Sequence, residues 1–424
     1  MSSTVLPQKR TFAVLGIETS CDDTCISVLQ CDMHKGGKPK IIHSAIARSL
    51  DENEQYGGIH PIVAVQSHQK HMQSLVNEAL KDIKSQGIQL DLVSVTKGPG
   101  MKASLQVGIS AAEKLATDLA IPVLGVHHMQ AHALTPRLLK DGPSPEFPYM
   151  SLLVSGGHTL LLKSQSVTDH EIIASTLDIA IGDCIDKIAK DLKVPWHGLM
   201  PGAALEVWCK DEELSTKDVY VPKTVSAELK KKFNIKVPLH AKVNVDGIRS
   251  DRMEFSFSGL GSSISRILKV MDLTEDEQRG LGAEAMKSAF DHVMEKVVAG
   301  LRLTKPQPNA LVISGGVARN AYLRQIMQAG LKRAGFGGIE LICPPLDLCS
   351  DNATMIAWTA FEMHQLQHKS QTPIMPRPKW PLTELLIQNE EEFSKILASR
   401  DKKQPHLPMK QPVAKKIKLS DTNM

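Results

Sequence analysis

A pair of histidines carries the first metal-binding signal in this chain. His128 and His132 stand four positions apart in a stretch that predicts a helix. Side chains at this spacing lie on one helix face, where two imidazoles can bind a divalent metal ion. The spacing alone is weak evidence, because the chain has 16 histidines and His364 and His368 repeat it; a solvated or core-edge pair is the simpler interpretation. A metal site needs a third, hard ligand, and Asp351, just before a predicted helix, is the best candidate.

Two glycine pairs predict turns that bind an anion or a nucleoside. Gly156-Gly157 follows an apolar strand predicted at 149–154, and Gly315-Gly316 follows another at 310–313. Because glycine has no Cβ, backbone N–H groups in such turns can approach a phosphate closely. We expect the two pairs, 159 residues apart, to lie on opposite sides of a cleft, one holding phosphate and the other a nucleoside. For either pair taken alone, a tight turn without a ligand is the alternative.

Several enzyme classes lack the motifs that they require. His170-Glu171 is not followed by the second histidine of a zincin protease, and the chain contains no Walker loop. The turn Gly98-Pro99-Gly100 is too short to hold a triphosphate by itself. The seven cysteines are odd in number and contain no C-x-x-C, which indicates reduced thiols rather than a disulfide framework. We interpret Cys21 and Cys184 as structural thiols rather than nucleophiles.

The elements that must position these residues alternate between strands and helices. A predicted hairpin opens each half of the chain, at 12–29 and at 149–163. The periodicity predicts further strands at 92–96, 123–126 and 310–313, and helices at 63–84, 104–120, 281–301, 318–330 and 353–364. This pattern predicts an α/β protein with two lobes of similar construction.

The sequence also predicts where these lobes begin and end. A Pro-rich stretch at 143–148 marks the lobe boundary, and 211–254 is charged and poorly periodic. The expected divisions are a short targeting segment at 1–11, an N-terminal lobe at 12–148, a C-terminal lobe at 149–352 with an insertion near 211–254, a closing helix at 353–364, and a peripheral extension at 365–424 that includes a short amphipathic helix near 383–397.

Charge and hydropathy limit the partners. Lys and Arg exceed Asp and Glu by four, and the tail at 401–424 carries that whole excess. A nucleic acid must therefore bind a local basic patch or the tail. Aromatic residues make up only 4% of the chain, which argues against a stacking platform for single strands. No stretch reaches the roughly 18 to 20 apolar residues of a membrane span, so we expect no membrane partner.

Eight sequence motifs stand in order along about residues 12–365. They are Gly16-Ile17-Glu18-Thr19-Ser20-Cys21-Asp22-Asp23-Thr24, Gly98-Pro99-Gly100, His127-His128-Met129-Gln130-Ala131-His132, Ser155-Gly156-Gly157-His158-Thr159, Gly182-Asp183-Cys184-Ile185-Asp186-Lys187, Phe255-Ser256-Phe257-Ser258-Gly259-Leu260, Ser314-Gly315-Gly316-Val317-Ala318-Arg319-Asn320 and Ser350-Asp351-Asn352-Ala353. In this order they resemble one enzyme family, the tRNA threonylcarbamoyltransferases, formerly described as O-sialoglycoprotein endopeptidases. The opening motif is similar to the bacterial and mitochondrial branch of that family.

This resemblance implies an actin/Hsp70-like fold of two lobes with a nucleotide and metal cleft between them. It implies transfer of a threonylcarbamoyl group from threonylcarbamoyl-AMP to the exocyclic amine of the tRNA adenosine beside the anticodon. One divalent cation per subunit (Fe, Zn or Mg) would be held by His128, His132 and Asp351. The implied substrate-binding residues are Val154, Ser155, Gly156, Gly157, His158, Asp186 on the ribose side, Gly202, and Asn320 on the nucleoside, with His158 also a candidate for proton transfer.

The chain departs from the family pattern at three places. Lys102 adds a charge where the family keeps a small turn, Gly261 replaces a lysine, and Ala203 replaces a glycine after Gly202. These departures put full activity in question more than the fold. An ATPase or sugar-kinase-like activity and a non-catalytic nucleotide-binding scaffold are the alternatives.

Assembly and compartment follow from the same resemblance. A homodimer is the expected assembly, with a larger complex as the alternative. The branch favours mitochondria, and the residues before Thr11 carry the weak bias of a transit peptide. The lysine-rich stretch at 412–419 instead resembles a nuclear-import signal, so cytoplasm or nucleus is the alternative; a solvated charge run also explains it.

Overall fold

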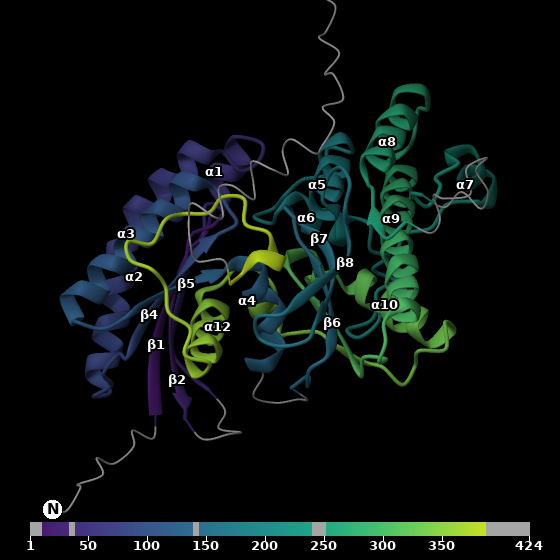
Figure 1. The fold of residues 1–424 in the computed structure, drawn as a ribbon. Coiled ribbons are helices and arrows are strands. Elements are labelled where there is room, and N and C mark those ends of the chain that lie inside the picture. Colours follow the sequence, from purple (N-terminus) through teal and green to yellow (C-terminus); the bar gives the residue numbers. More distant parts are fainter. Residues whose placement is uncertain (1–10, 34–38, 139–143, 240–251, 387–424) are drawn as a thin grey trace, which may run out of the picture. The chain divides into compact units, whose positions relative to one another are not determined.

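Two β-sheets organise the chain, and segments distant in sequence join them. The computed structural model describes residues 11–33, 39–138, 144–239 and 252–386. Within these ranges the architecture is the predicted two-lobe α/β fold, with one sheet in each lobe (Figure 1).

The first sheet combines three antiparallel strands with two parallel strands. Its order is β3-β2-β1-β4-β5; β1 pairs antiparallel with β2 and parallel with β4. The strands are β1 (Thr11–Glu18), β2 (Thr24–Asp32), β3 (Lys40–Ala47), β4 (Leu92–Gly98) and β5 (Val123–His127). The helices that follow within this half are α1 (Leu50–Gln55), α2 (Pro61–Ser85), α3 (Lys102–Leu119) and α4 (His128–Leu134), with a 3-10 turn η1 (Thr135–Leu138).

Alternating side chains of β1 fill a core on each face of this sheet. Leu15 and Ile17 pack into the cluster formed with α2 and α3, whereas Val14 packs into the cluster formed with α12 (Ala353–Gln365). Successive residues of a strand point to opposite faces, so an unbroken apolar run predicts a strand buried on both sides.

The second sheet has six strands and a larger core. Its order is β11-β10-β6-β7-β8-β9, with β6 parallel to β10 and antiparallel to β7. The strands are β6 (Tyr149–Val154), β7 (Thr159–Ser164), β8 (His170–Thr176), β9 (Glu254–Phe255), β10 (Ala310–Ser314) and β11 (Glu340–Ile342). The helices are α5 (Ile181–Asp191), α6 (Pro201–Trp208), α7 (Ala227–Phe233), α8 (Ser258–Val270), α9 (Glu275–Leu303), α10 (Ala321–Arg333) and α11 (Leu346–Cys349), with a 3-10 turn η2 (Gly316–Arg319).

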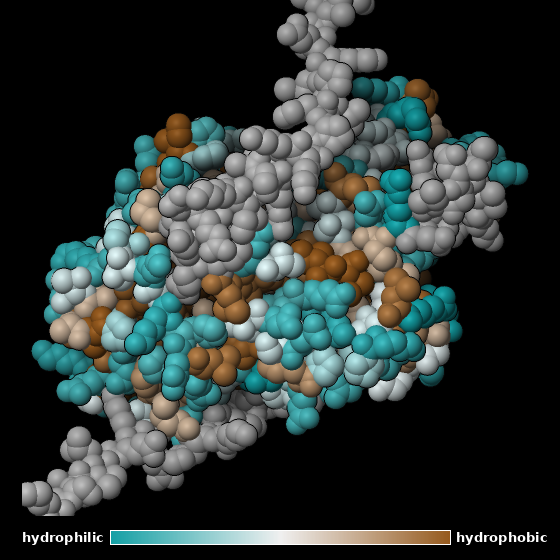
Figure 2. All heavy atoms as spheres, in the orientation of Figure 1, coloured by the Kyte–Doolittle hydropathy of each residue, from teal (hydrophilic) through white to brown (hydrophobic). Residues whose placement is uncertain are grey.

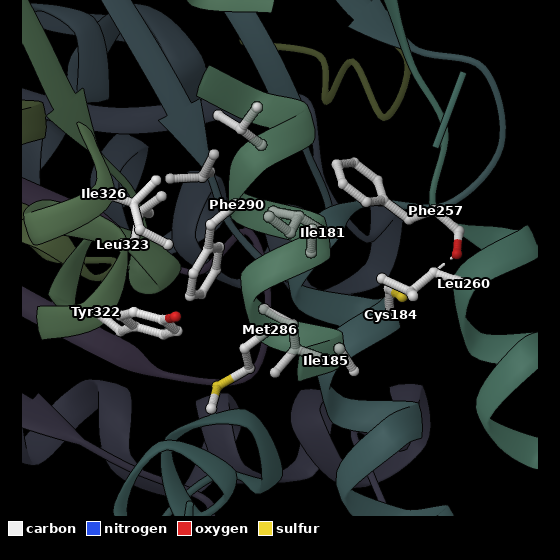
Figure 3. Close-up of a cluster of buried hydrophobic side chains, with 14 of the residues drawn as sticks. Ile181, Cys184, Ile185, Phe257, Leu260, Met286, Phe290, Tyr322, Leu323 and Ile326 are labelled. Atoms are coloured by element: carbon white, nitrogen blue, oxygen red, sulfur yellow. Dashed lines mark hydrogen bonds between the residues drawn. The ribbon is translucent and has the colours of Figure 1, made fainter. Parts of the chain in front are cut away.

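Helices from both ends of this half share one apolar core. Figure 3 shows Cys184 and Ile185 of α5 together with Phe290 of α9 and Leu323 of α10, and all four are buried. The Cys184 Sγ donates to the Phe257 carbonyl at 3.4 Å, and burial raises the pKa of this thiol to about 12. Cys184 is therefore a structural thiol, as the sequence indicated.

The helix α12 follows the second sheet in sequence but packs on the first. Figure 1 shows it beside β1 and β2. Gly16 permits this approach, because a Cβ there would lie 2.9 Å from the Ala357 backbone nitrogen. Ser27 on β2 also hydrogen-bonds Thr354 through their hydroxyls at 2.9 Å. The helix expected at 353–364 thus closes back onto the N-terminal lobe.

The segment after α12, residues 366–385, which we call the C-terminal strap, is more buried than expected. The sequence placed it in a peripheral extension, yet Ile374 lies in the core with α2 and α3, and Arg377 and Trp380 are buried. The strap is held by hydrogen bonds from Gly125 N to Ser370 Oγ (2.8 Å), from Ile374 N to Glu113 Oε1 (2.6 Å) and from Arg377 N to the Lys97 carbonyl (2.7 Å). The few apolar residues of the strap are separated by proline, lysine and other residues. Its hydropathy pattern therefore does not predict burial.

Other expectations fall wholly or partly outside the described residues. The targeting segment, apart from Thr11, lies outside the described residues, and so does the basic tail at 401–424. Most of the helix expected near 383–397 also lies outside them; at its start the structure has a 3-10 turn, η3 (Leu382–Glu384). The insertion near 211–254 is described over 211–239, which contains α7, and over 252–254, where β9 begins.

The visible face of the molecule mixes hydrophilic and apolar residues. Figure 2 shows the apolar residues there in several separate patches among hydrophilic ones. Within the described ranges, every helix is too short or too polar to span a bilayer.

The strap generates a stability prediction. Trp380 is 8% exposed and its ring lies 4.8 Å from that of His127, so Trp380→Ala should lower the free energy of unfolding by about 3 kcal/mol through lost burial and the cavity left behind. Denaturant unfolding would measure the change. Lys379→Ala, at the exposed neighbouring position, is the matched control and should change little. If both variants were as stable as the wild type, the strap would not contribute to the hydrophobic core.

Candidate metal and substrate site

The short helix α4 places both predicted histidine ligands on one side. It begins directly after β5, and His127 is its N-cap: the ring Nδ1 accepts hydrogen bonds from Met129 N at 3.1 Å and Gln130 N at 3.4 Å. His128 and His132 are both buried, with ring centroids 4.7 Å apart and planes nearly perpendicular. One helical turn therefore brings the two imidazoles together, as the spacing predicted.

Asp351 reaches these histidines from the far end of the chain. It lies between α11 and α12, just before Asn352, whose side chain caps α12. Its Oδ1 is 3.1 Å from His132 Nε2 and 3.5 Å from His128 Nε2. One ligand atom from each of the three residues lies within 4.8 Å of the others.

The second histidine pair is different. His364 stacks on Phe12 at 4.5 Å, and within the described residues neither His364 nor His368 joins a group that could hold a metal. The chain thus contains an internal comparison between two pairs of equal spacing.

Burial and charge act in opposite directions at the three-residue cluster. Burial disfavours a charged His128, but the Asp351 and Glu18 carboxylates outweigh it and raise the pKa of His128 to about 9. Burial likewise opposes ionisation of Asp351, yet His128 and His132 hold its pKa well below the usual range. Two imidazole nitrogens and one carboxylate oxygen form a donor set that suits Zn²⁺ or Fe²⁺ better than Mg²⁺, which prefers oxygen ligands.

The two glycine turns are neighbours, not opposed, and the sequence expectation was wrong on this point. They follow the parallel strands β6 and β10, which pair directly, with Ser314 opposite Leu153. A Cβ on Gly315 would lie 2.8 Å from the Val154 carbonyl carbon. A crossover of more than 150 residues returned the chain to the adjacent strand, so sequence separation carried no information about distance.

The turn after β6 is tight and open to solvent on its glycine side. Ser155 N donates to the His158 carbonyl at 2.9 Å, and His158 N donates to Ser155 Oγ at 3.0 Å. Gly156 and Gly157 are exposed, and a Cβ at either would meet nothing within 4 Å. The helix α5 begins directly against this turn, since Gly182 N donates to the Ser155 carbonyl at 3.2 Å.

His158 lies at the end of this turn, near the histidine cluster but outside its three-residue group. Burial, with the His128 and His132 charges, lowers the pKa of His158 to about 4. Its imidazole is therefore neutral at physiological pH, and a pKa this low also makes it a weak base.

Asp186, Gly202 and Asn320 all lie on elements around α5. Asp186 Oδ1 accepts from Gly202 N at 2.7 Å, and burial raises the pKa of Asp186 to about 6 against that hydrogen bond. Asn320 caps α10, accepting from Leu323 N at 3.0 Å. The helix α5 contacts both α6 and η2, which carry Gly202 and the residues before Asn320. The residues implied for substrate binding thus have clear local roles in the fold.

The three departures from the family pattern do not disturb packing. Lys102 is the exposed first residue of α3, and Ala203 is exposed on α6. Gly261 lies in α8, where a Cβ would meet nothing within 4 Å.

Sequence reasoning missed two carboxylates. Glu18, the last residue of β1, is 1% exposed and accepts a hydrogen bond from His128. Asp178 accepts from Ser256 Oγ at 2.7 Å, Phe257 N at 2.9 Å and Ser258 Oγ at 2.6 Å, which orients the motif before α8. The position of Glu18, an acid at the end of an apolar strand, could have marked it as a candidate site residue. Asp178 had no such sequence signal, because its partners lie 78 to 80 positions away.

Comparison with known proteins identifies the family of this chain. The family model for tRNA N6-adenosine threonylcarbamoyltransferase matches residues 40–358. A mitochondrial tRNA N6-adenosine threonylcarbamoyltransferase of Schizosaccharomyces pombe is 40% identical over 384 residues, 89% of this chain and 88% of that one. A Brucella canis relative of the same name is 34% identical over 377 residues, 88% of this chain and 95% of its own.

One solved structure supports the fold alone. T. kodakarensis HypF superposes with a TM-score of 0.51 at 13% identity, covering 87% of this chain and 50% of that one. With the family model matching most of the sequence and a relative 40% identical along nearly all of it, the chain belongs to the tRNA N6-adenosine threonylcarbamoyltransferase family.

Proposed function

We propose that this protein transfers a threonylcarbamoyl group from threonylcarbamoyl-AMP to the exocyclic amine of a tRNA adenosine beside the anticodon. Membership of the transferase family supports the reaction class and tRNA as the substrate. The observation that carries the site assignment is the cluster of His128, His132 and Asp351, all within 4.8 Å through their ligand atoms. No observation favours the ATPase or scaffold alternatives.

A divalent cation held by His128, His132 and Asp351 fits the residues present. His128 and His132 turn their Nε2 atoms toward one carboxylate oxygen. Such a cation, when bound, stabilises negative charge that develops on the phosphate and carbonyl oxygens. The donor set favours Zn²⁺ or Fe²⁺ as its identity.

The turn at Val154–His158 is the proposed site for the adenylate. Exposed Gly156 and Gly157 leave room for a phosphate beside the backbone. Asp186 would bind the ribose side and Asn320 the nucleoside, with Gly202 held beside Asp186.

The proposed reaction moves the acyl group from a phosphate oxygen to the adenosine nitrogen. The adenosine amine forms a C–N bond to the carbonyl carbon, the bond from that carbon to the phosphate oxygen breaks, and AMP leaves with the electron pair. The amine must lose a proton, and the His158 imidazole, at the end of the glycine turn, is the proposed acceptor.

Assembly and compartment complete the proposal. A mitochondrial location agrees with the name of the S. pombe relative. A homodimer is the proposed assembly. The segments that would bear on import and on tRNA affinity, 1–10 and the basic tail 401–424, lie outside the described residues.

The proposal predicts a new nucleoside in tRNA. Purified protein incubated with threonylcarbamoyl-AMP and unmodified tRNA should yield N6-threonylcarbamoyladenosine, measured by mass spectrometry of digested tRNA. A protein that binds the adenylate yet forms no product would support the scaffold alternative instead.

The two histidine pairs predict opposite metal contents. His128→Ala, His132→Ala and Asp351→Ala should each strip bound metal and lower transfer about 100-fold or more, because charge stabilisation is lost. His364→Ala and His368→Ala are the matched controls and should retain both. Elemental analysis and the tRNA assay would be run on all five; metal retained by the first three would contradict the assignment.

The glycine turn predicts loss of ligand without loss of fold. A Cβ at Gly157 meets nothing within 4 Å, so Gly157→Val should fold normally but weaken binding of a non-reactive adenylate analogue by about tenfold or more through steric exclusion. Calorimetry would measure the affinity. Gly338→Val, at an equally open and exposed position, is the control. Unchanged affinity in folded Gly157→Val would make this turn purely structural.

A further inference from the structure

A buried carboxylate lies behind one of the two histidines. Glu18 Oε2 is 3.1 Å from His128 Nδ1, while the opposite ring nitrogen, Nε2, faces Asp351. The Ser20 hydroxyl is 3.2 Å from the same Nδ1. Glu18 lies outside the three-residue ligand group and hydrogen-bonds that group at the His128 ring.

The Glu18 side chain is fixed by elements on both sides. Thr96 Oγ1 on β4 donates to Oε2, and Ser20 N donates to Oε1. Glu18 is the last residue of β1, which pairs with β4, and its exposed fraction is 1%. Its carboxylate therefore occupies one orientation, set by backbone and by a neighbouring strand.

A histidine that binds a metal through Nε2 must carry its proton on Nδ1. A carboxylate acceptor at Nδ1 selects that tautomer, holds the ring plane and increases the basicity of Nε2. His132 differs, because its Nδ1 is buried without a hydrogen-bond partner in the described structure. The ring of His128 is thus the one that the protein orients from behind.

We propose that Glu18 is a positioning residue for the metal site, acting through the Nδ1 proton of His128. This inference rests on the proposed function, specifically on the metal assignment. A buried carboxylate is costly unless it is paired and hydrogen-bonded, and every described partner of Glu18 serves to aim it at this ring. The effect of Glu18 on His128 does not depend on the transfer reaction, so the affinity of the protein for the metal is enough to measure it.

The test is a chelator competition for Zn²⁺ on the purified full chain. Glu18→Gln keeps the shape but removes the negative acceptor, and it should raise the Kd for Zn²⁺ about 10-fold, with Glu18→Ala closer to about 100-fold. Thr96→Val leaves the carboxylate but frees it from β4, and it should give a smaller rise. Circular dichroism would establish folding; Thr96→Val supplies the answer if both Glu18 variants fail to fold.

The chain offers a matched control in a second carboxylate–imidazole pair. Asp82 Oδ2 lies 2.7 Å from His43 Nδ1, and neither residue belongs to the ligand group. Asp82→Asn should leave the Zn²⁺ affinity unchanged. Wild-type affinity in the folded Glu18 and Thr96 variants would overturn the inference, as would an equal loss in Asp82→Asn.

Two further outcomes separate this inference from the metal assignment. If Glu18→Ala abolishes binding as fully as His128→Ala, Glu18 is a ligand rather than a positioning residue, and the inference is wrong. If His128→Ala itself retains the metal, the proposed function fails first.

Discussion

The position of one carboxylate oxygen governs much of this structure. Asp351 Oδ1 must lie within reach of two imidazoles carried by α4, although Asp351 and His132 are 219 positions apart. The chain meets this requirement by returning α12 to the first sheet after completing the second. Gly16 allows that return, since any side chain there would collide with the backbone of α12. A small residue on β1 thereby sets where the third proposed ligand lies.

The helix α4 is short, and an isolated helix of seven residues would be unstable in water. The surrounding structure holds it from several directions. Its N-cap, His127, is fixed through Nε2 by the Trp380 carbonyl of the strap at 2.8 Å. From the second sheet, Tyr149 donates to the Ala133 carbonyl at 2.9 Å, and Gln130 donates to the Val167 carbonyl at 2.8 Å. The proposed ligands thus depend on both lobes and on the strap, a segment that the sequence placed in a peripheral extension.

Much of the fold and part of the site could be predicted from the sequence. Apolar runs predicted strands at 92–96 and 149–154, where the structure has β4 and β6. His128 and His132 share a helix face, as their spacing indicated. The relation between the glycine turns could not be predicted, because strand order across a long crossover is set by tertiary packing. The buried strap was missed because its contacts use backbone groups and isolated side chains such as Ile374. Glu18 was visible as an acid in an apolar context, but its partner on α4 lies 110 positions away.

The central claim is that two histidines and one carboxylate from distant positions in the sequence bind the same metal ion. X-ray absorption spectroscopy of the Zn²⁺-loaded protein tests it most directly, because the donor atoms are identified by distance. The account predicts only nitrogen and oxygen donors at about 2.0 to 2.2 Å, with the outer scattering of two imidazoles. Cys25 and Cys349 are buried near Asp351 in space or sequence, and Cys25 Sγ donates to the Asp351 carbonyl at 3.7 Å. A sulfur donor at about 2.3 Å would place the ion on such a thiol and contradict the account.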